Sequence, residues 1–302
     1  MLISIIGANS YIARNLVFYI RRQEDAIIKL YDVQEQSADG VNAYECIDFI
    51  NKKSLQKIDW NSDIIYFFTG KTGTEQGFVD FNLFVDINEK YLLCFLDEYV
   101  RNQSKARIMF PSTRLIYKGN KTMSLTEDAE KEFKAVYALN KYCCEKYLEM
   151  YHNRYNIEYT ILRIGVPYAT LIKGARSYGT LDFFLDRALS QSNIQIFGDG
   201  LQRRTFTHIE DLCAVMLAAG THQKCKNNIF NIGGEEMSVV ELASKIAQRY
   251  QVEVTHVTAS ESACKLESGC TVFSSEKLDS ILGRHYNHNF DKWLNLKEGD
   301  GE

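Results

Sequence analysis

The sequence predicts an α/β fold, in which a doubly wound parallel sheet is followed by a smaller C-terminal α/β lobe. Up to Tyr168, short apolar runs alternate with longer amphipathic stretches, which is the pattern of parallel strands joined by helices. After Tyr168 the texture of the chain changes, and a helix, a strand-like run and a glycine-rich turn follow. This change indicates a second, smaller unit.

Composition is that of a globular protein. The chain has 302 residues, of which 45% are hydrophobic and 25% charged, and its formal net charge is −4. This charge gives no strong attraction to nucleic acid or to an anionic membrane, so we expect neither as a partner. The longest apolar run, residues 64–68, is far too short to cross a bilayer, and the first residues lack a basic leader.

The cysteines indicate a reducing compartment. All eight are scattered, with no Cys-x-x-Cys pair and no histidines at a spacing typical of zinc sites. We therefore expect reduced thiols, no metal site and a cytoplasmic protein.

The first strand, turn and helix form a unit suited to a dinucleotide. Residues 2–6 are an apolar run, and the amphipathic stretch that follows ends in two arginines, which suit the end of a helix. Between them, a pyrophosphate-binding turn needs glycine where the backbone bends and small residues where the phosphates approach. Gly7, Ser10 and Ala13 occupy these positions, and a plain strand-to-helix turn is the alternative.

The second strand, residues 26–31, ends in Asp32, which lies 19 residues beyond Ala13. A carboxylate at this place holds both hydroxyls of an adenosine ribose and repels a 2′-phosphate. No arginine follows in residues 33–35, so the sequence favours NAD over NADP. The alternative is an aspartate in a solvated loop.

Two further strands bring polar residues to the same edge of the sheet. Residues 42–47 form a third strand that ends in Asp48, and a short helix is expected over residues 51–58. Residues 63–68 form a fourth strand that leads into the glycine-bearing turn 69–73. Open α/β sheets bind their ligands at such turns, at the carboxyl ends of the strands.

A long helix is expected over residues 82–102. Its period places six side chains inward: Leu83, Phe84, Ile87, Tyr91, Cys94 and Phe95. Asn88 is polar within this helix and could reach a ligand, although the period alone favours a surface position.

A proton-transfer set lies between the fifth strand and the next long helix. The strand at residues 106–110 runs into Pro111-Ser112-Thr113, and the helix, over residues 133–154, carries Tyr137 and Lys141. A free tyrosine has a pKa of about 10, and an ammonium at i+4 favours its phenolate. Bringing that pKa near 7 needs roughly 4 kcal/mol, so a second positive charge, such as a nicotinium ring, would help.

Three Tyr-x-x-x-Lys matches occur, and their context selects Tyr137. Tyr117 lies just before a predicted loop, and Tyr142 points to a different side of the helix from Tyr137. Two solvated side chains are the alternative for any one match. Glu145, at i+4 from Lys141, could pair with it.

The remaining chain supplies a further strand at residues 159–163 and then the second lobe. We expect helices over residues 181–190, 210–219, 238–250 and 275–282, and strands over residues 193–197, 228–234, 252–257 and 272–273. Ser238 is expected to cap the third of these helices. Arg203 and Arg204 suit an anionic ligand because guanidinium groups match phosphate oxygens, and an exposed basic turn is the alternative.

Taken together, the chain resembles the extended short-chain dehydrogenase/reductase family, in its NAD-dependent nucleotide-sugar epimerase/dehydratase branch, over nearly its whole length. The motifs that carry the resemblance occur in the family's order and spacing: Gly7–Ala13, Asp32, Asp48, Phe68–Lys71, Asn88, Pro111–Tyr117, Tyr137/Lys141/Glu145, Leu162–Arg163, Ile196–Gly200 and Arg204–Asp211. Each motif alone is weakly specific, but ten in order are strong.

The resemblance implies an architecture. Residues 1–166 would form an NAD-binding Rossmann domain to which residues 205–234 return, and residues 167–204 and 235–302 would form the substrate-binding lobe. It also implies a homodimer, in which two long helices of each subunit, residues 82–102 and 133–154, pack as a four-helix bundle.

The resemblance also implies roles for individual residues. Thr113 would bind the sugar hydroxyl under attack, Tyr137 would act as acid and base, and Lys141 would bind the nicotinamide ribose and lower the tyrosine pKa. Phe197 would pack on the base of the nucleotide sugar and Arg204 would bind its diphosphate, with Lys71 and Thr113 completing the substrate site. The implied NAD-binding residues are Gly7, Ser10, Tyr11, Ile12, Ala13, Asp32 for the ribose, Asp48 for the adenine edge, Phe68, Thr69, Gly70, Asn88, Tyr137, Lys141 and Pro167.

The chain departs from the family's pattern at four places. Ser10 and Ala13 replace glycines of the pyrophosphate turn. Val166 stands where the family has an asparagine that contacts the nucleotide sugar, ahead of Pro167. Arg114 follows Thr113 where the 4,6-dehydratases have an Asp-Glu pair, which disfavours elimination of water.

Three functions follow as hypotheses. The first is an NAD-dependent epimerase of a nucleotide sugar, acting at C4 through a 4-keto intermediate. The second is an NAD(P)H-dependent reductase of a 4-keto sugar nucleotide or of another carbonyl. The third is a dinucleotide-binding regulator without turnover, which the intact Tyr137/Lys141 pair disfavours.

Overall fold

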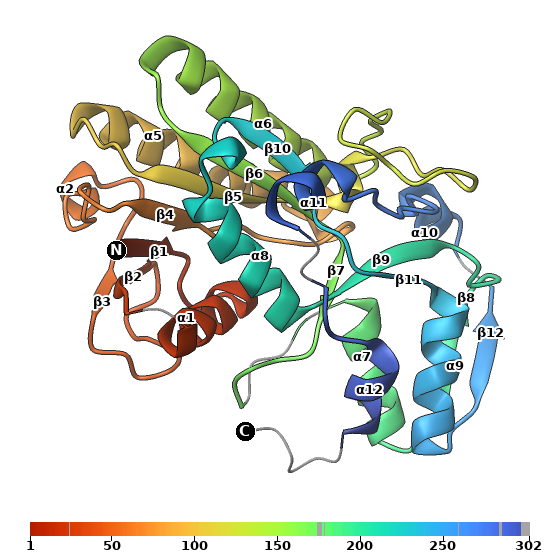
Figure 1. Cartoon of the computed structure of the whole chain (residues 1–302). Helices are drawn as coiled ribbons and strands as arrows, with labels where there is room; N and C mark the ends of the chain where they lie inside the picture. Colours follow the sequence, from red (N-terminus) through yellow and green to blue (C-terminus); the bar gives the residue numbers. More distant parts are fainter. Residues whose placement is uncertain (24, 174–176, 178, 259, 284–285, 297–302) are drawn as a thin grey trace.

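The computed structural model describes the whole chain except residues 24, 174–176, 178, 259, 284–285 and 297–302. Figure 1 shows a large α/β layer structure that carries a smaller group of helices and strands at one end. Among the described residues, no helix has both the length and the apolar character needed to cross a bilayer.

Seven of the described strands form one parallel sheet in the order β10-β6-β5-β4-β1-β2-β3. Their bounds are β1 Leu2–Ile6, β2 Ile27–Asp32, β3 Tyr44–Cys46, β4 Ile64–Phe67, β5 Arg107–Thr113, β6 Tyr159–Ile164 and β10 Asn228–Asn231. The chain builds outward from β1 in one direction and then returns to build from β4 in the other. The turns after β1 and β4 therefore meet at the carboxyl edge, where doubly wound sheets bind ligands.

Helices cover both faces of this sheet because its strands are apolar on both sides. Ile3 and Ile5 face α1 (Tyr11–Gln23) and α8 (Ile209–Thr221), whereas Ile6 and Ile65 face α5 (Tyr91–Arg101) and α6 (Val136–Tyr155). Figure 1 shows the two layers on opposite sides of the sheet. The short helix α2 (Lys52–Leu55) covers the second face through Leu55.

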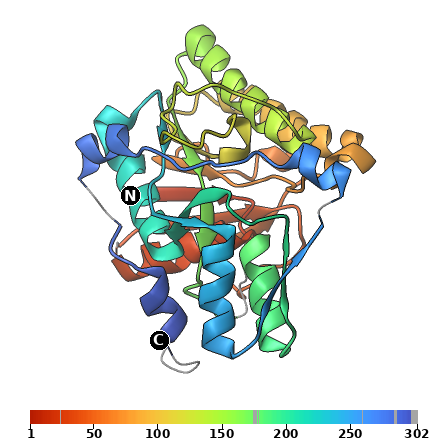
Figure 2. The same ribbon diagram turned by 90° about the vertical axis from the view of Figure 1, so that its right-hand side faces the viewer.

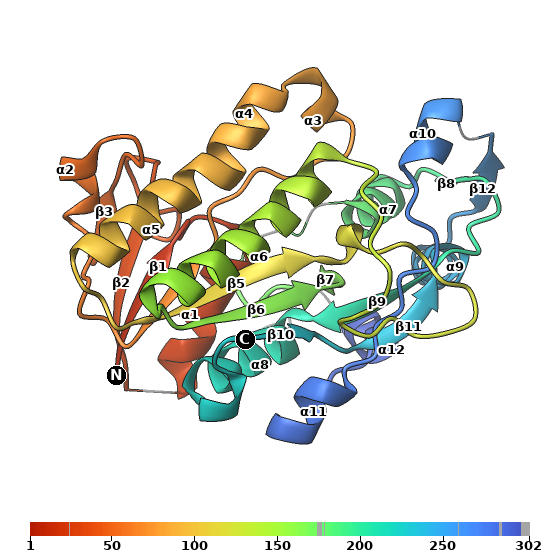
Figure 3. The ribbon, with the colours of Figure 1, turned by 90° about the horizontal axis from the view of Figure 1, so that it is seen from above.

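A π-helical turn interrupts the long helix expected over residues 82–102. The chain forms α4 (Phe81–Val85), a π-helical turn (Asp86–Lys90) and then α5, which run beside α6 in Figure 3. The wider turn shifts the helical phase. The expectation of an inward Leu83 is wrong, because Leu83 is 37% exposed, and the expectation of a surface Asn88 is wrong as well, because Asn88 is buried one helical turn after Phe84.

The smaller lobe has its own core. β11 (Glu235–Ser238), β9 (Arg203–His208) and β7 (Val166–Tyr168) form a three-stranded sheet, and β8 (Ile194–Phe197) pairs with β12 (Val254–Val257). The helices α7 (Thr180–Leu189), α9 (Val239–Tyr250) and α12 (Phe290–Asn295) pack around these strands, as Figure 2 shows. Ser238 caps α9 in a capping box with Glu241, which confirms the predicted cap.

The short elements are the ones that differ from expectation. β7 and β11 were not expected, and neither were α3 (Gln76–Val79), α10 (Glu261–Leu266), α12 and the 3₁₀ turns Arg114–Ile116 and Gln223–Cys225. Residues 272–273 are not a strand, since Phe273 forms only an isolated bridge with Leu125. Helix α11 (Glu276–Leu282) was expected in the smaller lobe, but its apolar Leu278 joins the core beneath α8, so the structure places α11 with the large sheet.

A buried ion pair joins α6 to the central strands. Arg163 of β6 donates from Nη2 and Nε to the two carboxylate oxygens of Glu145, at 2.7 and 3.0 Å. Both side chains are almost fully buried, at 3% and 0% exposed. Ser112 of β5 donates to the same carboxylate, and Arg163 also donates to the hydroxyl of Tyr117, at 2.7 Å. One carboxylate therefore fixes the position of α6 against β5 and β6.

We predict that Glu145→Gln lowers the free energy of unfolding by about 3–5 kcal/mol, because it leaves the Arg163 guanidinium buried without a countercharge. Urea unfolding followed by circular dichroism measures this. The matched control is Glu130→Gln, which removes an exposed pair with Lys118 (70% and 51% exposed) and should leave the free energy of unfolding nearly unchanged, because solvent screens the pair. Equal losses in the two variants would show that the buried pair does not fix the helix.

Candidate functional site

The turn after β1 lies directly against the turn after β4, and Gly7 makes the contact. Its φ is +79°, a conformation that side chains rarely adopt. A Cβ added at Gly7 would lie 2.6 Å from the backbone nitrogen of Thr69 and 2.8 Å from the carbonyl carbon of Phe68. Only glycine therefore allows this close approach.

The same edge carries polar atoms that lack a partner. Asp32, at the end of β2, is 8% exposed, and its carboxylate accepts the backbone N–H groups of Asn9 and Val33 at 2.9 and 2.7 Å. Among the described residues, the hydroxyls of Ser10 and Thr69 are buried without a hydrogen-bond partner. Buried hydroxyls normally have partners. Two unsatisfied hydroxyls beside a glycine turn fit the phosphates of a dinucleotide, so the residues present suit NAD.

Three further residues expected at the cofactor, Ala13, Tyr11 and Ile12, lie in the first turn of α1 and differ in burial. Ala13 is fully buried, which keeps α1 close to the sheet, and Tyr11 donates its hydroxyl to the carbonyl of Ala169, two residues after Pro167 in β7. Ile12 is half-buried beside them. These contacts connect the start of α1 to the smaller lobe.

Phe68 and Asp48 lie in different surroundings. The ring of Phe68 stacks on that of Tyr66, with 5.9 Å between centroids, and is buried. Asp48 is exposed, and its carboxylate accepts the backbone N–H of Ile50 at 2.9 Å. Its contact with an adenine stays a prediction.

Lys141 is buried at the centre of the site. It is 5% exposed, and its Nζ donates to the carbonyl oxygen of Pro111 at 2.9 Å and lies 4.4 Å from the ring centroid of Phe110. Burial lowers the pKa of this ammonium to about 8. A Cβ added at Gly70 would lie 3.6 Å from this Nζ and 3.2 Å from Oδ1 of Asn88, so the turn after β4 reaches the lysine.

Two contacts around the lysine differ from the sequence expectation. Glu145 does not pair with Lys141, because its carboxylate is taken by Arg163 and Ser112. Asn88 faces inward, where Oδ1 accepts the backbone N–H of Lys71 at 2.8 Å. The structure thus gives Asn88 a role in holding the turn that contains Lys71.

Tyr137 and Thr113 lie at the same edge of the sheet. Tyr137 is 9% exposed and stands one helical turn before Lys141 on α6. Thr113 is 8% exposed, ends β5 two residues after the carbonyl that binds Lys141, and accepts the backbone N–H of Leu115 at 3.3 Å. The phenol and the ammonium are carried by α6 and the hydroxyl by β5, and the hydrogen bond from Ser112 of β5 to Glu145 of α6 joins these two elements.

The other tyrosines with a lysine at i+4 have different surroundings. Tyr117 is fully buried, and its hydroxyl donates to Asn231 at 2.7 Å within the Arg163 network. The Tyr142 ring packs against Phe133 and beneath Lys146. Tyr117 therefore has a structural role, and Tyr142 lies on another side of α6 from Tyr137.

The two arginines of the second lobe differ from each other. Arg203 is partly exposed and pairs with Glu236 and Glu241, as expected for a basic turn. Arg204 is 6% exposed, so that alternative is wrong for it. It donates to Glu267 at 2.9 Å and to Thr180 at 3.2 Å, while its Nε is buried without a partner. Phe197, at the end of β8, is 58% exposed.

Three residues near the site were not among the predicted site residues: Glu267, Asn140 and Arg114. Glu267 binds Arg204 through its carboxylate. Asn140 donates to Glu89 and accepts from Asn88 at 3.3 Å, which joins α6 to the π-helical turn. Such partners come from distant parts of the chain, so no local pattern indicates them. Arg114 was noted only as a departure from the family's acids.

A cluster of histidines lies where α8 begins. Ligand atoms of His208, Glu210 and His288 lie within 4.8 Å of one another, and the two rings stack at 4.1 Å. Nδ1 of His208 accepts the backbone N–H of Glu210 at 3.2 Å, which makes His208 a helix cap. Since Nδ1 is an acceptor, the neutral ring carries its proton on Nε2, the nitrogen that a shared metal would need. The cluster fits a cap better than a metal centre.

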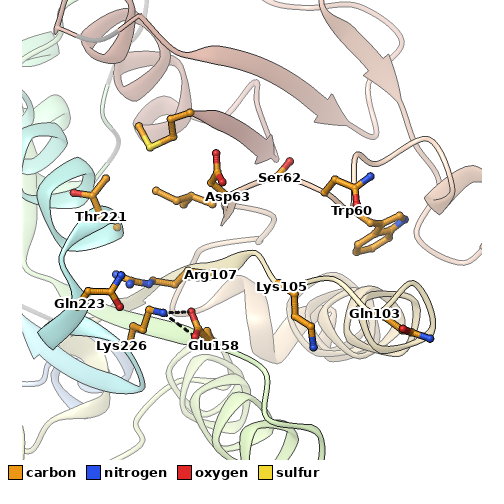
Figure 4. A pocket seen from close by; sticks show the side chains of 14 residues that line it. Trp60, Ser62, Asp63, Gln103, Lys105, Arg107, Glu158, Thr221, Gln223 and Lys226 are labelled. Carbon is orange, nitrogen blue, oxygen red and sulfur yellow. Dashed lines mark hydrogen bonds and ion pairs between the residues drawn. The ribbon is translucent and has the colours of Figure 1, made fainter.

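A cavity of about 550 Å³ lies at the opposite edge of the sheet, by the amino ends of β1, β4 and β5 (Figure 4). Three of its charged side chains already have protein partners. Arg107 donates to the carbonyls of Ala219 and His222 at 2.9 and 2.8 Å, and Lys226 pairs with Glu158 at 2.7 Å. The candidate functional site is therefore not in this cavity.

Comparisons with known proteins agree with this geometry. The family model described as NAD dependent epimerase/dehydratase family matches residues 3–233. A curated relative from Methanocaldococcus jannaschii, named a putative UDP-glucose 4-epimerase, is 39% identical over 107 residues, which are 35% of this chain and 34% of that protein. The chain thus matches about a third of that relative's length.

Two solved structures share the fold. The UDP-glucose 4-epimerase of Thermotoga maritima, with UDP-glucose, has a TM-score of 0.85 at 19% identity. The superposition covers 98% of this chain and 97% of the epimerase chain. The UDP-glucuronic acid 4-epimerase of Bacillus cereus, in complex with UDP-glucuronic acid and NAD, has a TM-score of 0.83 at 22% identity and covers 97% of this chain and 96% of its own.

We predict that the titration of Lys141 makes the free energy of unfolding depend on pH. Its folded pKa of about 8 lies below the value of about 10.4 in an unfolded chain, so the unfolded state binds more protons between these pH values. Stability therefore rises with pH in this window. Relative to Lys141→Met, the wild type should gain up to ~2–3 kcal/mol between pH 7.5 and pH 10, measured by urea unfolding. A constant difference between the two proteins would contradict the buried, desolvated ammonium.

Proposed function

Since the chain belongs to the NAD dependent epimerase/dehydratase family, we propose that it inverts a nucleotide sugar at C4 through a 4-keto sugar. The observation that carries this proposal is the buried Tyr137/Lys141 pair beside Thr113, at the sheet edge where Gly7 and Asp32 lie. Similar proteins named 4-epimerases support the choice of C4.

The cofactor site is assigned to the turns after β1, β2 and β4. Ser10 and Thr69 would donate their unpaired hydroxyls to the pyrophosphate, and the Asp32 carboxylate would bind the adenosine ribose. A negative charge at Asp32 disfavours a 2′-phosphate, so NAD is proposed over NADP. When bound, NAD supplies a reversible hydride acceptor beside the sugar carbon.

The proton steps belong to Tyr137. As a phenolate it takes the proton of the C4 hydroxyl while C4 becomes a ketone, and it returns that proton once the opposite face of the ketone has been reduced. Thr113 binds the same oxygen and orients it. The nearby Lys141 cation favours the phenolate. Because its pKa is lowered to about 8, the charge of a bound ligand would change how much of this lysine is protonated.

The surroundings of Thr113 favour epimerisation over dehydration. Elimination of water from the sugar needs an acid and a base near C5 and C6. The two residues that follow Thr113 are Arg114 and Leu115, and neither supplies a carboxyl group. We therefore propose that the 4-keto sugar turns over in the site and is reduced, without loss of water.

Substrate binding is assigned to the cleft between the two lobes. Arg204 would bind the diphosphate and Phe197, an exposed aromatic side chain, would pack on the base. We keep the proposed division into an NAD-binding domain and a substrate lobe, with α11 moved to the former. All eight cysteines are free, which suits the proposed cytoplasmic location.

Replacing the proposed acid and base tests the function. Tyr137→Phe should lower the rate of epimerisation by about 10²–10⁴, the usual contribution of a general acid or base, and should leave NAD binding intact. The assay follows UDP-glucose, UDP-glucuronate and UDP-N-acetylglucosamine by chromatography. Tyr142→Phe, the control on the same helix, should keep its rate. If both variants are equally active, Tyr137 is not the catalytic acid and base.

A stripe of apolar side chains on α6 supports the proposed homodimer. Leu139, Cys143, Tyr147 and Met150 recur at helical spacing, and Leu139 and Met150 are 46% and 52% exposed. The neighbouring segment of α3 and α4 adds Phe81, Leu83 and Val85, each at least 37% exposed. Exposed apolar surface of this extent marks an interaction site, and a second copy of the two adjacent helices would cover it.

We predict a sedimenting species of twice the 34.8 kDa chain at micromolar concentration. Leu139→Lys combined with Met150→Lys should convert it to a monomer, because charges would be buried in the bundle. Leu189→Lys, which alters an exposed leucine on α7 of the other lobe, should not change the mass. A wild-type protein that sediments as a monomer would remove the dimer proposal.

A further inference from the structure

Arg114 is a partly buried charged side chain that borders the candidate functional site. It directly follows Thr113, and its Nη1 donates to the hydroxyl of Thr271 at 3.1 Å. Among the described residues, it has no carboxylate within ion-pair distance. Burial, followed by the nearby charge of Arg204, lowers its pKa to about 9. Arg114 is thus held in a place that disfavours its charge.

Among the described residues, one carboxylate, that of Glu267, lies near both Arg204 and Arg114, and it forms an ion pair with Arg204. Glu267 places one carboxylate oxygen 2.9 Å from Arg204 and accepts the backbone N–H of Gly269 with the other, at 3.0 Å. Arg114 donates to a neutral hydroxyl and is repelled by Arg204, and the Glu267 carboxylate offsets only part of the resulting fall in its pKa. Lys134 donates to the backbone carbonyl of Glu267 at 2.8 Å and pairs with Glu132 at 3.3 Å, so its own charge is balanced. Cations this close together are stable when an anion joins them.

The position of Arg114 shows which part of a substrate it reaches. In the proposed reaction Thr113 binds the oxygen on C4, so the next residue lies near the groups on the adjacent ring carbons. A carboxylate attached to C5 is the closest anionic group that a sugar can carry to C4. The diphosphate is attached at C1, across the ring, and the proposed function already gives it Arg204.

We propose that Arg114 selects a sugar that carries a carboxylate, so that the substrate is a nucleotide-linked hexuronate. This inference rests on the proposed function and adds the substrate class to it. A guanidinium binds a carboxylate through two parallel hydrogen bonds, which a neutral hydroxymethyl group cannot match. Arg114 is then a specificity-determining residue, whereas Thr113, Tyr137 and Lys141 act on any sugar that the cleft admits.

Calorimetric titration of the full chain with UDP-glucuronate, UDP-glucose and UDP tests this proposal. The wild type should bind UDP-glucuronate at least about tenfold more tightly than UDP-glucose, the least expected of one charge-assisted hydrogen bond. Arg114→Gln should abolish that preference and change binding of UDP-glucose and UDP by no more than about threefold. Arg114→Lys, which keeps the charge, should retain part of the preference. Arg204→Gln should weaken binding of all three ligands.

The results that would overturn the inference about Arg114 differ from those that would overturn the proposed function. If Arg114→Gln weakens UDP and UDP-glucose as much as UDP-glucuronate, Arg114 binds the diphosphate and the inference is overturned. The same holds if the wild type does not distinguish the two sugars. If none of the three ligands binds the wild type while NAD does, the proposed nucleotide-sugar function itself fails. Thermal unfolding of each variant shows whether a loss of binding reflects loss of the fold.

Discussion

The attachment of α6 to β5 by buried charged side chains determines where the candidate catalytic groups lie. Lys141 donates to the Pro111 carbonyl, and the Glu145 carboxylate binds Ser112 and Arg163. Each charge would cost several kcal/mol if it lost its partner in the interior. The helix therefore cannot slide or rotate along the strand without leaving a buried charge unpaired, and the positions of Tyr137 and Thr113 follow from that constraint.

A second consequence concerns the charge of the cleft. The chain is acidic overall, with a net charge of −4, yet it has two buried cations, Lys141 and Arg204, and a partly buried one, Arg114. Ser10 and Thr69 add buried hydroxyls that lack partners. A site of this kind is complementary to ligands with several negative charges, as a dinucleotide and a nucleotide sugar have. The same groups that lower the stability of the empty protein would thus bind the ligands.

Much of the fold could be predicted from the sequence because its signals are local. The strands are apolar runs with a polar residue or a turn at each end, and the Ser238 cap depends on two residues three positions apart. Asn88 was misjudged because a polar side chain was expected at the surface, although it lies one helical turn after the buried Phe84 and its amide finds partners in Lys71 and Asn140. The partners of Glu145, Arg114 and Arg204 could not be predicted, because Arg163, Thr271 and Glu267 meet them only through the folding of distant segments. The roles of the site residues stay predictions until they are measured.

The most direct test of the account follows a deuterium atom placed on C4 of the nucleotide sugar that the protein binds. Epimerisation by reversible oxidation at C4 predicts that the inverted product keeps the deuterium on C4, because the hydrogen removed from this carbon returns to the same carbon. The mass spectrum of the separated epimer should therefore match that of the labelled substrate. Replacement of the label by solvent hydrogen, or accumulation of the 4-keto sugar in place of an epimer, would contradict the proposed mechanism.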